Sequence, residues 1–204
     1  MNILRLYLFG KNLIPYFEER EEEKAAGEES GTAEEGSSWL RKVHRQVLHL
    51  YRMLESKFPL NERLCTRLLS AGRAHAVYSS AATPEEARIA LHRFFHRQAR
   101  RHRFWFGTDF FLACLGALLM PLPGPNIFFF YPAVRAYSNY RAWRGAARGL
   151  HFAFQWEPSE EIRNFESRLP RAAGRDFNAQ VGLLSERLLL PGLTTFLAKK
   201  KVYR

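Results

Sequence analysis

An apolar stretch interrupted by a cluster of prolines restricts the fold of this chain more than any other feature. Residues 104–120 ("FWFGTDFFLACLGALLM") carry one charged side chain, Asp109, and residues 121–126 read "PLPGPN". A second apolar stretch, residues 127–134, ends at Arg135. Because proline lacks a backbone N–H, a cluster of prolines breaks a helix and leaves fewer polar groups to satisfy at the turn. The sequence therefore predicts a helical hairpin.

The length and the flanks of this hairpin leave two environments open. As a helix, residues 104–120 would reach about 25 Å, which is less than the roughly 30 Å hydrocarbon core of a bilayer. Arginine-rich segments stand before and after the hairpin, and this would place both of its ends on the same side of a membrane. The alternative is a soluble hairpin that the other helices cover. A covered hairpin favours the soluble alternative, and a bare apolar surface favours lipid.

The rest of the chain has helical periodicity. Apolar side chains recur every three or four positions in residues 39–58 and in residues 61–78. Thr83 is expected to cap a third helix, with Pro84 at its first position and Glu86 closing a capping box. Two more helices are expected to begin at about 158 and 176. We predict an all-α fold, a helical bundle with a central apolar hairpin broken by a Pro/Gly turn, to which a short N-terminal strand over Ile3–Phe9 could be added.

Composition divides the chain into five predicted segments. Residues 18–38 hold nine Glu against Arg20 and Lys24, with Gly and Ser between them, which is typical of a disordered acidic linker. The five segments are an N-terminal part of the folded body at 1–17, the acidic linker at 18–38, amphipathic helices with a basic end at 39–103, the apolar hairpin and a basic aromatic helix at 104–149, and C-terminal amphipathic helices at 150–204.

Asp109 is the first candidate for chemistry, because it is the single ionisable group in its apolar stretch. A carboxyl group in such surroundings has its pKa raised, which suits a site that exchanges protons. A solvated position, or a pair with Arg103 or Arg135, is the structural alternative. Asn126 is expected to cap the helix that follows the prolines, and binding of an anion at that helix end is its functional alternative.

Other kinds of chemistry have little support in the sequence. The two cysteines, Cys65 and Cys114, cannot form a disulfide framework or a zinc site, and they are expected to be small core residues. His92 and His96 are four positions apart but have no acidic or cysteine partner at metal-site spacing, so we expect no metal and no cofactor. No nucleophile, phosphate-binding or dinucleotide motif occurs, and we expect no enzyme activity.

Basic and aromatic side chains border the hairpin on both sides. The whole chain has a net charge of +11, and such a surface attracts phosphate on lipid or on nucleic acid. The first cluster precedes the hairpin and consists of Arg97, Arg100, Arg101 and Arg103. The second follows it and provides the predicted contacts to lipid headgroups or anions, which are Arg135, Tyr140, Arg141, Arg144 and Arg148. Because both clusters adjoin the apolar hairpin, lipid headgroups are the more economical partner and nucleic acid is the alternative.

The segment "PLPGPNIFFFYPAVRAYSNYRAWRG" resembles the central signature of the mitochondrial K+/H+ exchange-related family. The resemblance covers residues 104–149, and "RLYLFG" and "LPGLTTFLAKKK" are similar to the ends of that family. The acidic stretch at 18–38 departs from the pattern. The hairpin turn is carried by Pro121 and by signature positions Pro123, Gly124, Pro125, Asn126 and Pro132, and the remaining matching positions are Tyr131, Arg135, Tyr140, Arg141 and Gly145.

The resemblance implies a role in potassium–proton exchange or monovalent cation homeostasis, as a component or as a regulator. It implies a place at the mitochondrial inner membrane in a eukaryote or at the cell inner membrane in a bacterium. The alternative is a soluble cytoplasmic interaction module whose basic surface binds an acidic partner or nucleic acid. One short hairpin cannot enclose a path for ions, so transport would require a homo-oligomer or another membrane subunit.

Overall fold

The structure is a computed structural model that describes residues 3–9, 14–17, 38–55, 58–118, 127–168, 175–190 and 192–200. The predicted hairpin turn and the acidic linker up to residue 37 lie outside these ranges. Helices account for 73% of the described residues, and four strands form one mixed sheet, so the all-α prediction is correct for most of the chain and wrong for the sheet. The chain divides into two compact units.

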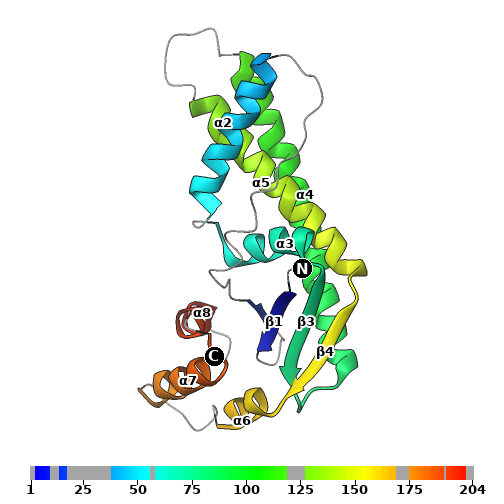
Figure 1. Cartoon of the computed structure of the whole chain (residues 1–204), viewed down its shortest axis with the longest axis vertical. Coiled ribbons are helices and arrows are strands. Elements are labelled where there is room, and N and C mark those ends of the chain that lie inside the picture. The colour runs from blue at the N-terminus through cyan, green and yellow to red at the C-terminus, as the bar shows by residue number, and fades with distance from the viewer. Residues whose placement is uncertain are drawn as a thin grey trace. The chain divides into compact units, whose positions relative to one another are not determined.

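The first unit contains residues 1–20, 71–94 and 151–204. Its sheet has the order β2-β1-β3-β4 (Figure 1). Strand β1 (Ile3–Phe9) pairs antiparallel with β2 (Ile14–Tyr16) and parallel with β3 (Arg73–Ser79), which pairs parallel with β4 (Phe154–Ser159). The short N-terminal strand that the sequence suggested over Ile3–Phe9 is therefore confirmed, with the predicted bounds.

Strand β3 corrects the predicted helix over residues 61–78. Helix α3 (Leu60–Ser70) forms as expected, but the chain then turns through Ala71 and Gly72 into β3. Since β3 lies between two parallel strands, Ala74, Ala76 and Tyr78 are buried in the sheet. The strand is thus stabilised by partners far away in sequence, and this overrides local helical periodicity.

The described part of the first unit also contains three helices and the start of α4 (Pro84–Leu118). Helix α6 (Glu160–Arg168) begins after Ser159, whose hydroxyl accepts a hydrogen bond from the Ile162 backbone N–H at 3.4 Å. The expected helix start at 158 is therefore two residues early, because Pro158 and Ser159 still belong to β4. Helices α7 (Arg175–Arg187) and α8 (Leu193–Lys200) follow, and Phe196 on α8 packs against Tyr16 with ring centroids 4.8 Å apart.

Helix α4 begins with the predicted capping box. The Thr83 backbone N–H donates to the Glu86 carboxylate at 2.9 Å, and the Glu86 backbone N–H donates to the Thr83 hydroxyl at 3.3 Å. These contacts satisfy two backbone donors that a helix start leaves open. The helix then runs unbroken for 35 residues to Leu118.

The second unit contains residues 21–70 and 95–150, and the regular elements described in it are all helices. Helix α2 (Ser38–Glu55), the second part of α4 and α5 (Ile127–His151) lie alongside one another (Figure 1). Tyr51 of α2 meets Tyr137 of α5 edge to face at 5.1 Å, and Phe106 of α4 meets Tyr140 of α5 at 5.5 Å. Helix α5 thus packs against both of the other helices.

Small residues allow α5 to approach α3 and α4 closely. A Cβ atom at Gly145 would overlap the backbone carbonyl of Cys65 on α3, and one at Gly149 would lie 2.9 Å from the Phe95 ring on α4. Ala142 and Ala146 on the same part of α5 are fully buried. This close packing fixes the position of α5, which carries the next residues of interest.

Candidate functional site

A row of buried polar residues lies on the inner face of α4. His102 and Gln98 are buried, and Asp109 is half-buried. These residues are four and seven positions apart, and such spacing places them on one side of a helix. A polar group that is removed from water is costly unless it finds a hydrogen-bond partner. The partners of His102 and Asp109 come from α5.

Asn139 of α5 connects these two ionisable groups through its amide. Its Nδ2 donates to Asp109 Oδ2 at 2.7 Å, and its Oδ1 lies 2.8 Å from His102 Nδ1. Because an amide oxygen can only accept, His102 must carry a proton on Nδ1 and donate it to Asn139. Asn139 is almost completely buried, so its amide has no competing water. The three side chains therefore form one chain of hydrogen bonds, His102–Asn139–Asp109.

The neighbouring residue on α5 engages a second buried carboxylate. Ser138 donates its hydroxyl proton to Glu62 Oε1, and Glu62 belongs to α3 with only 3% of its surface exposed. Arg135 Nη1 lies 3.4 Å from Glu62 Oε1 and 3.5 Å from Oε2. The buried carboxylate thus has both a hydrogen-bond donor and a positive charge beside it. Since Ser138 and Asn139 are consecutive, the two clusters lie side by side on α5.

Burial favours the neutral forms of the two ionisable groups in this hydrogen-bonded chain, His102 and Asp109. Burial raises the pKa of Asp109 above its usual value of 3.8, and the Asn139 hydrogen bond and the positive Arg135 partly oppose this. Burial lowers the pKa of His102 below its usual value of 6.5, and the Asn139 hydrogen bond and the negative Glu62 partly oppose that. The two pKa values are thereby moved toward each other. Glu62 and Arg135 influence both groups, so the six residues form one electrostatic cluster, which we call the polar cluster (Glu62, His102, Asp109, Arg135, Ser138 and Asn139).

The structure places the predicted arginines and tyrosines of α5 in contact with other side chains of the second unit. The Arg135 guanidinium lies 5.4 Å from the Phe58 ring centroid as well as beside Glu62. Arg141 lies over the rings of Tyr51 and Tyr137, at 5.3 and 5.9 Å. Arg144 donates to the Tyr140 hydroxyl at 3.3 Å, and Arg148 donates to the Leu69 carbonyl at 2.7 Å. Pro132 lies inside α5, and the helix continues through it.

Several other predicted residues do not join this cluster. Pro121, Pro123, Gly124, Pro125 and Asn126 lie outside the described residues. Arg103, one expected partner of Asp109, instead lies over the Trp143 ring at 5.9 Å. His92 and His96 are exposed. Within the described part of the chain, no group of three or more His, Cys, Asp or Glu side chains could hold a metal ion.

The expectation that both cysteines are core residues is half correct. Cys65 is buried, whereas Cys114 is exposed on α4. Burial, together with the nearby negative Glu62, raises the pKa of the Cys65 thiol. Cys65 is therefore held in its uncharged form beside the polar cluster.

Sequence reasoning identified Asp109 and Arg135 but missed Glu62, His102, Ser138 and Asn139. A signal for His102 was present, because it stands seven positions before Asp109 and so shares its face of the helix. The other three residues come from different helices, up to 76 positions away from their partners. Ser138 and Asn139 stand three and four positions after Arg135 on α5, but no spacing within one helix could have connected them to Glu62, His102 or Asp109.

The comparison with protein families now identifies the group to which this structure belongs. A family model described as mitochondrial K+-H+ exchange-related matches residues 16–152, which is more than half of the chain. The chain belongs to this family. The match includes every residue of the polar cluster. Searches of curated proteins and of solved structures found no match.

Membership confirms the resemblance that the central signature indicates, and the family's name relates the chain to K+-H+ exchange and to mitochondria. Among its described helices, none has the length and apolar character needed to cross a bilayer.

Proposed function

We propose that this protein is a proton-sensitive, non-enzymatic component or regulator of K+-H+ exchange that works at a membrane, together with further copies or another membrane subunit. The observation that carries the proposal is the hydrogen-bonded chain His102–Asn139–Asp109. It joins two ionisable groups through a buried amide inside a member of a K+-H+ exchange-related family.

Asp109 is the proposed proton-sensitive group of this site. Among the described residues, it is the one carboxylate that accepts a hydrogen bond from the buried amide of Asn139, and it lies in the apolar part of α4. When Asp109 takes up a proton, the negative charge that faces Asn139, and through it His102, disappears. The loss of this charge also changes the electrostatic environment of Arg135 and Glu62, because both interact electrostatically with Asp109 and His102. Proton binding at Asp109 would thus alter the forces that hold α3, α4 and α5 together, which is how such a group could regulate a partner.

A comparison of Asp109→Asn with wild type tests the proposal. Organelles that lack the protein are supplied again with either form, and potassium-driven swelling and the accompanying pH change are recorded. We expect the variant to lose the pH dependence of these responses, because Asn has the shape of Asp but cannot ionise. Glu161→Gln is the matched control, since Glu161 is an exposed carboxylate on α6 of the first unit. Unaltered swelling and pH change in Asp109→Asn would end the proposed role.

A second candidate function is favoured by the charge of the helical unit. Its segments 38–70 and 95–150 contain fifteen Lys and Arg against three Asp and Glu. Such a surface could hold nucleic acid or an acidic protein instead of lipid. Retardation of nucleic acid that weakens steeply with salt would support this function.

A further inference from the structure

The outward face of α4 changes from basic to apolar along one line of the helix. Its side chains are three or four positions apart and are, in order, Arg97, Arg101, Phe104, Thr108, Phe111 and Leu115, which we call the α4 stripe. Phe104 is 68% exposed, Phe111 62% and Leu115 44%, and both arginines are exposed. The inner face of the same helix carries the polar cluster. Within the described part of the chain, helix α4 is therefore packed on its inner side, and the side chains of its outer side are exposed.

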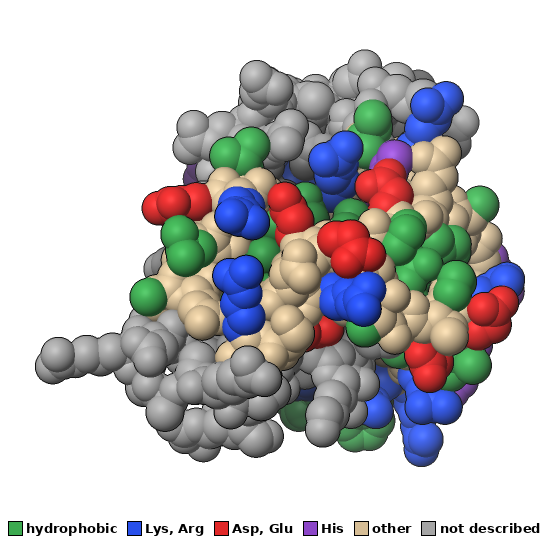
Figure 2. Space-filling model, turned by 90° about the horizontal axis from the view of Figure 1, so that it is seen from below, with side chains coloured by type: hydrophobic (Ala, Val, Ile, Leu, Met, Phe, Trp, Pro, Cys, Tyr) green, Lys and Arg blue, Asp and Glu red, His purple; other side chains and the backbone are tan. Residues whose placement is uncertain are grey.

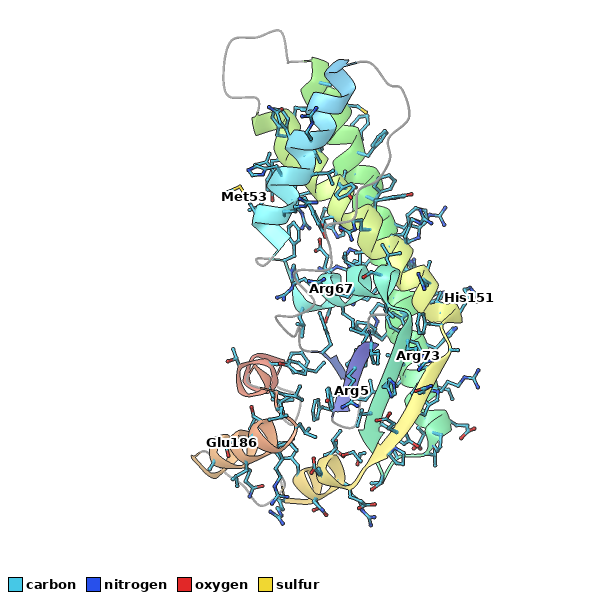
Figure 3. All side chains as sticks on the ribbon, in the orientation of Figure 1. Arg5, Met53, Arg67, Arg73, His151 and Glu186 are labelled. Atoms are coloured by element: carbon cyan, nitrogen blue, oxygen red, sulfur yellow. The ribbon has the colours of Figure 1, made fainter. Side chains whose placement is uncertain are left out.

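The apolar part of the stripe is broad, and Thr108 is the one polar side chain within it. Trp105 and Leu112 extend it on one side, and both are close to half exposed. Thr108 donates its hydroxyl proton to the Phe104 carbonyl at 3.3 Å, so the helix itself provides a partner for that hydroxyl. Phe110, which is 56% exposed, is a further apolar side chain of α4. Exposed large apolar side chains also occur on other helices of this unit, such as Met53, which projects away from α2 (Figure 3). A continuous apolar surface of this kind marks a place of contact with a partner or a membrane.

The charge of the unit indicates which partner covers this surface. The first unit, over its described residues, has ten Lys and Arg against eight Asp and Glu, and Figure 2 shows a face on which both signs are interspersed. Over its own described residues the second unit has fourteen against three, and two of these three acids, Glu62 and Asp109, are engaged in the polar cluster. Among the described residues, the excess of positive charge is therefore larger in the unit that carries the stripe.

We propose that the α4 stripe docks on an anionic lipid bilayer, with Phe104, Phe111 and Leu115 inserted among the acyl chains and Arg97 and Arg101 at the headgroups. From Phe104 to Leu115 the helix rises about 17 Å, which suits shallow insertion into one leaflet. Arginine beside an inserted apolar face binds lipid phosphate. A second copy of the chain fits less well because the described helices that carry the stripe are positively charged in both copies, and nucleic acid provides no aliphatic surface to cover Leu115.

The proposal deepens the proposed function by naming a membrane partner, and it is tested without any ion gradient. Purified full-length protein is floated with vesicles of phosphatidylcholine and phosphatidylglycerol in equal parts, and with phosphatidylcholine alone. We expect binding to the mixed vesicles and little to the neutral ones. The triple variant Phe104→Ser/Phe111→Ser/Leu115→Ser should bind the mixed vesicles about tenfold more weakly, because its apolar contact is gone.

The matched control is Ile89→Ser/Leu183→Ser, which removes exposed apolar side chains of similar size from the first unit. We expect it to bind as wild type does. A triple variant that binds the vesicles like wild type would overturn the proposal. The proposal would also be overturned if wild type self-associated in buffer and the triple substitution abolished this self-association. Binding of nucleic acid in preference to vesicles, through the same three residues, would overturn it as well.

A measurement on the wild-type chain keeps the test independent of variant folding. Cys114 is exposed on α4 and Cys65 is buried, so an environment-sensitive dye can be attached at Cys114. We expect its emission to shift to the blue with mixed vesicles, and an unchanged emission would contradict insertion. If vesicle binding succeeds while Asp109→Asn leaves potassium responses unaltered, the docking surface stands and the proton-sensing role falls. If vesicle binding fails while Asp109→Asn abolishes the pH dependence of the potassium responses, only the proposed docking surface is refuted.

Discussion

The amide of Asn139 lies between an acid and a base, with its Nδ2 2.7 Å from Asp109 Oδ2 and its Oδ1 2.8 Å from His102 Nδ1. Asn139 is the sole side chain of the described residues that an observed hydrogen bond places against both groups. It stabilises the ionised form of Asp109 by donating to it, and it stabilises the proton on His102 by accepting from it. The effect of replacing Asn139 can therefore be stated for both neighbours.

The variant Asn139→Leu should move the two pKa values in opposite directions. Without the donated hydrogen bond the pKa of Asp109 should rise further, and without the acceptor the pKa of His102 should fall further. The variant should also lose about 1–3 kcal/mol of unfolding free energy, because two partly buried polar groups lose their partner. NMR titration of both side chains and urea unfolding provide the measurements. Unchanged titration of both groups would show that the amide does not couple to them.

His102 should make stability depend on pH in a defined direction. Its pKa in the folded protein lies below the usual 6.5, so its contribution to stability is present above pH 6.5 and is lost as the pH falls through the lower folded value. The contribution of Asp109 to stability has the opposite pH dependence. Its raised pKa stabilises the folded state at low pH, and this stabilisation is lost as the pH rises. In urea unfolding between neutral and mildly acidic pH, His102→Gln should therefore lose less stability than wild type does. Equal losses in the two proteins would contradict the assignment.

Glu62 and Arg135 should behave as a coupled pair. Arg135→Met leaves a carboxylate that is 3% exposed with Ser138 as its remaining described partner, and it should cost about 2–4 kcal/mol. Replacement of both residues, in Glu62→Gln/Arg135→Met, should cost less than the sum of the two single changes, because the uncompensated charge is then absent. A double-mutant cycle in urea measures the difference. Additive costs would mean that the two side chains do not interact.

The sequence shows which part of the site is unusual but not how the site is completed. Asp109 stands out because no other charge occurs in its apolar stretch, and this can be seen without a structure. Its partner Asn139 is 30 positions away, in a segment whose arginines and tyrosines suggest a surface role. Serine and asparagine are common in helices, so nothing local marks Ser138 and Asn139 as buried. Their role depends on the close packing of α5 against α3 and α4.

The sheet was missed for a similar reason. Residues 61–78 place Leu64, Leu68, Leu69 and Ala76 at helical spacing, yet the second half of this segment becomes β3. Register pairs such as Leu6 with Ala76 and Ala76 with Trp156 join strands separated by about seventy residues or more. Pairing of this kind gives no periodic signal within one segment. The strand Ile3–Phe9 could be predicted because it is a short run of mostly apolar and aromatic side chains followed by Gly10.

Gly145 and Gly107 should respond in opposite ways to the same substitution. A methyl group at Gly145 would overlap the Cys65 carbonyl, which is backbone and cannot rotate away, so Gly145→Ala should cost roughly 3 kcal/mol or more. At Gly107, on α4, nothing lies within 4 Å of the new methyl group, and Gly107→Ala should stabilise the helix by up to about 1 kcal/mol. Thermal unfolding of both variants measures the contrast. A harmless Gly145→Ala would show that α3 and α5 are not in close contact.

The two cysteines should differ in reactivity as long as the protein is folded. Cys114 is exposed, whereas Cys65 is fully buried and the pKa of its thiol is raised by that burial and by Glu62. A thiol needs both access and its ionised form to react, so a maleimide should label one cysteine per native chain and two in urea. Cys114→Ser is the control and should remain unlabelled until it unfolds. Rapid native labelling of Cys65 in this variant would mean that α3 separates from α5 in solution. The buried environment derived for the polar cluster, which shares that interface, would then be wrong as well.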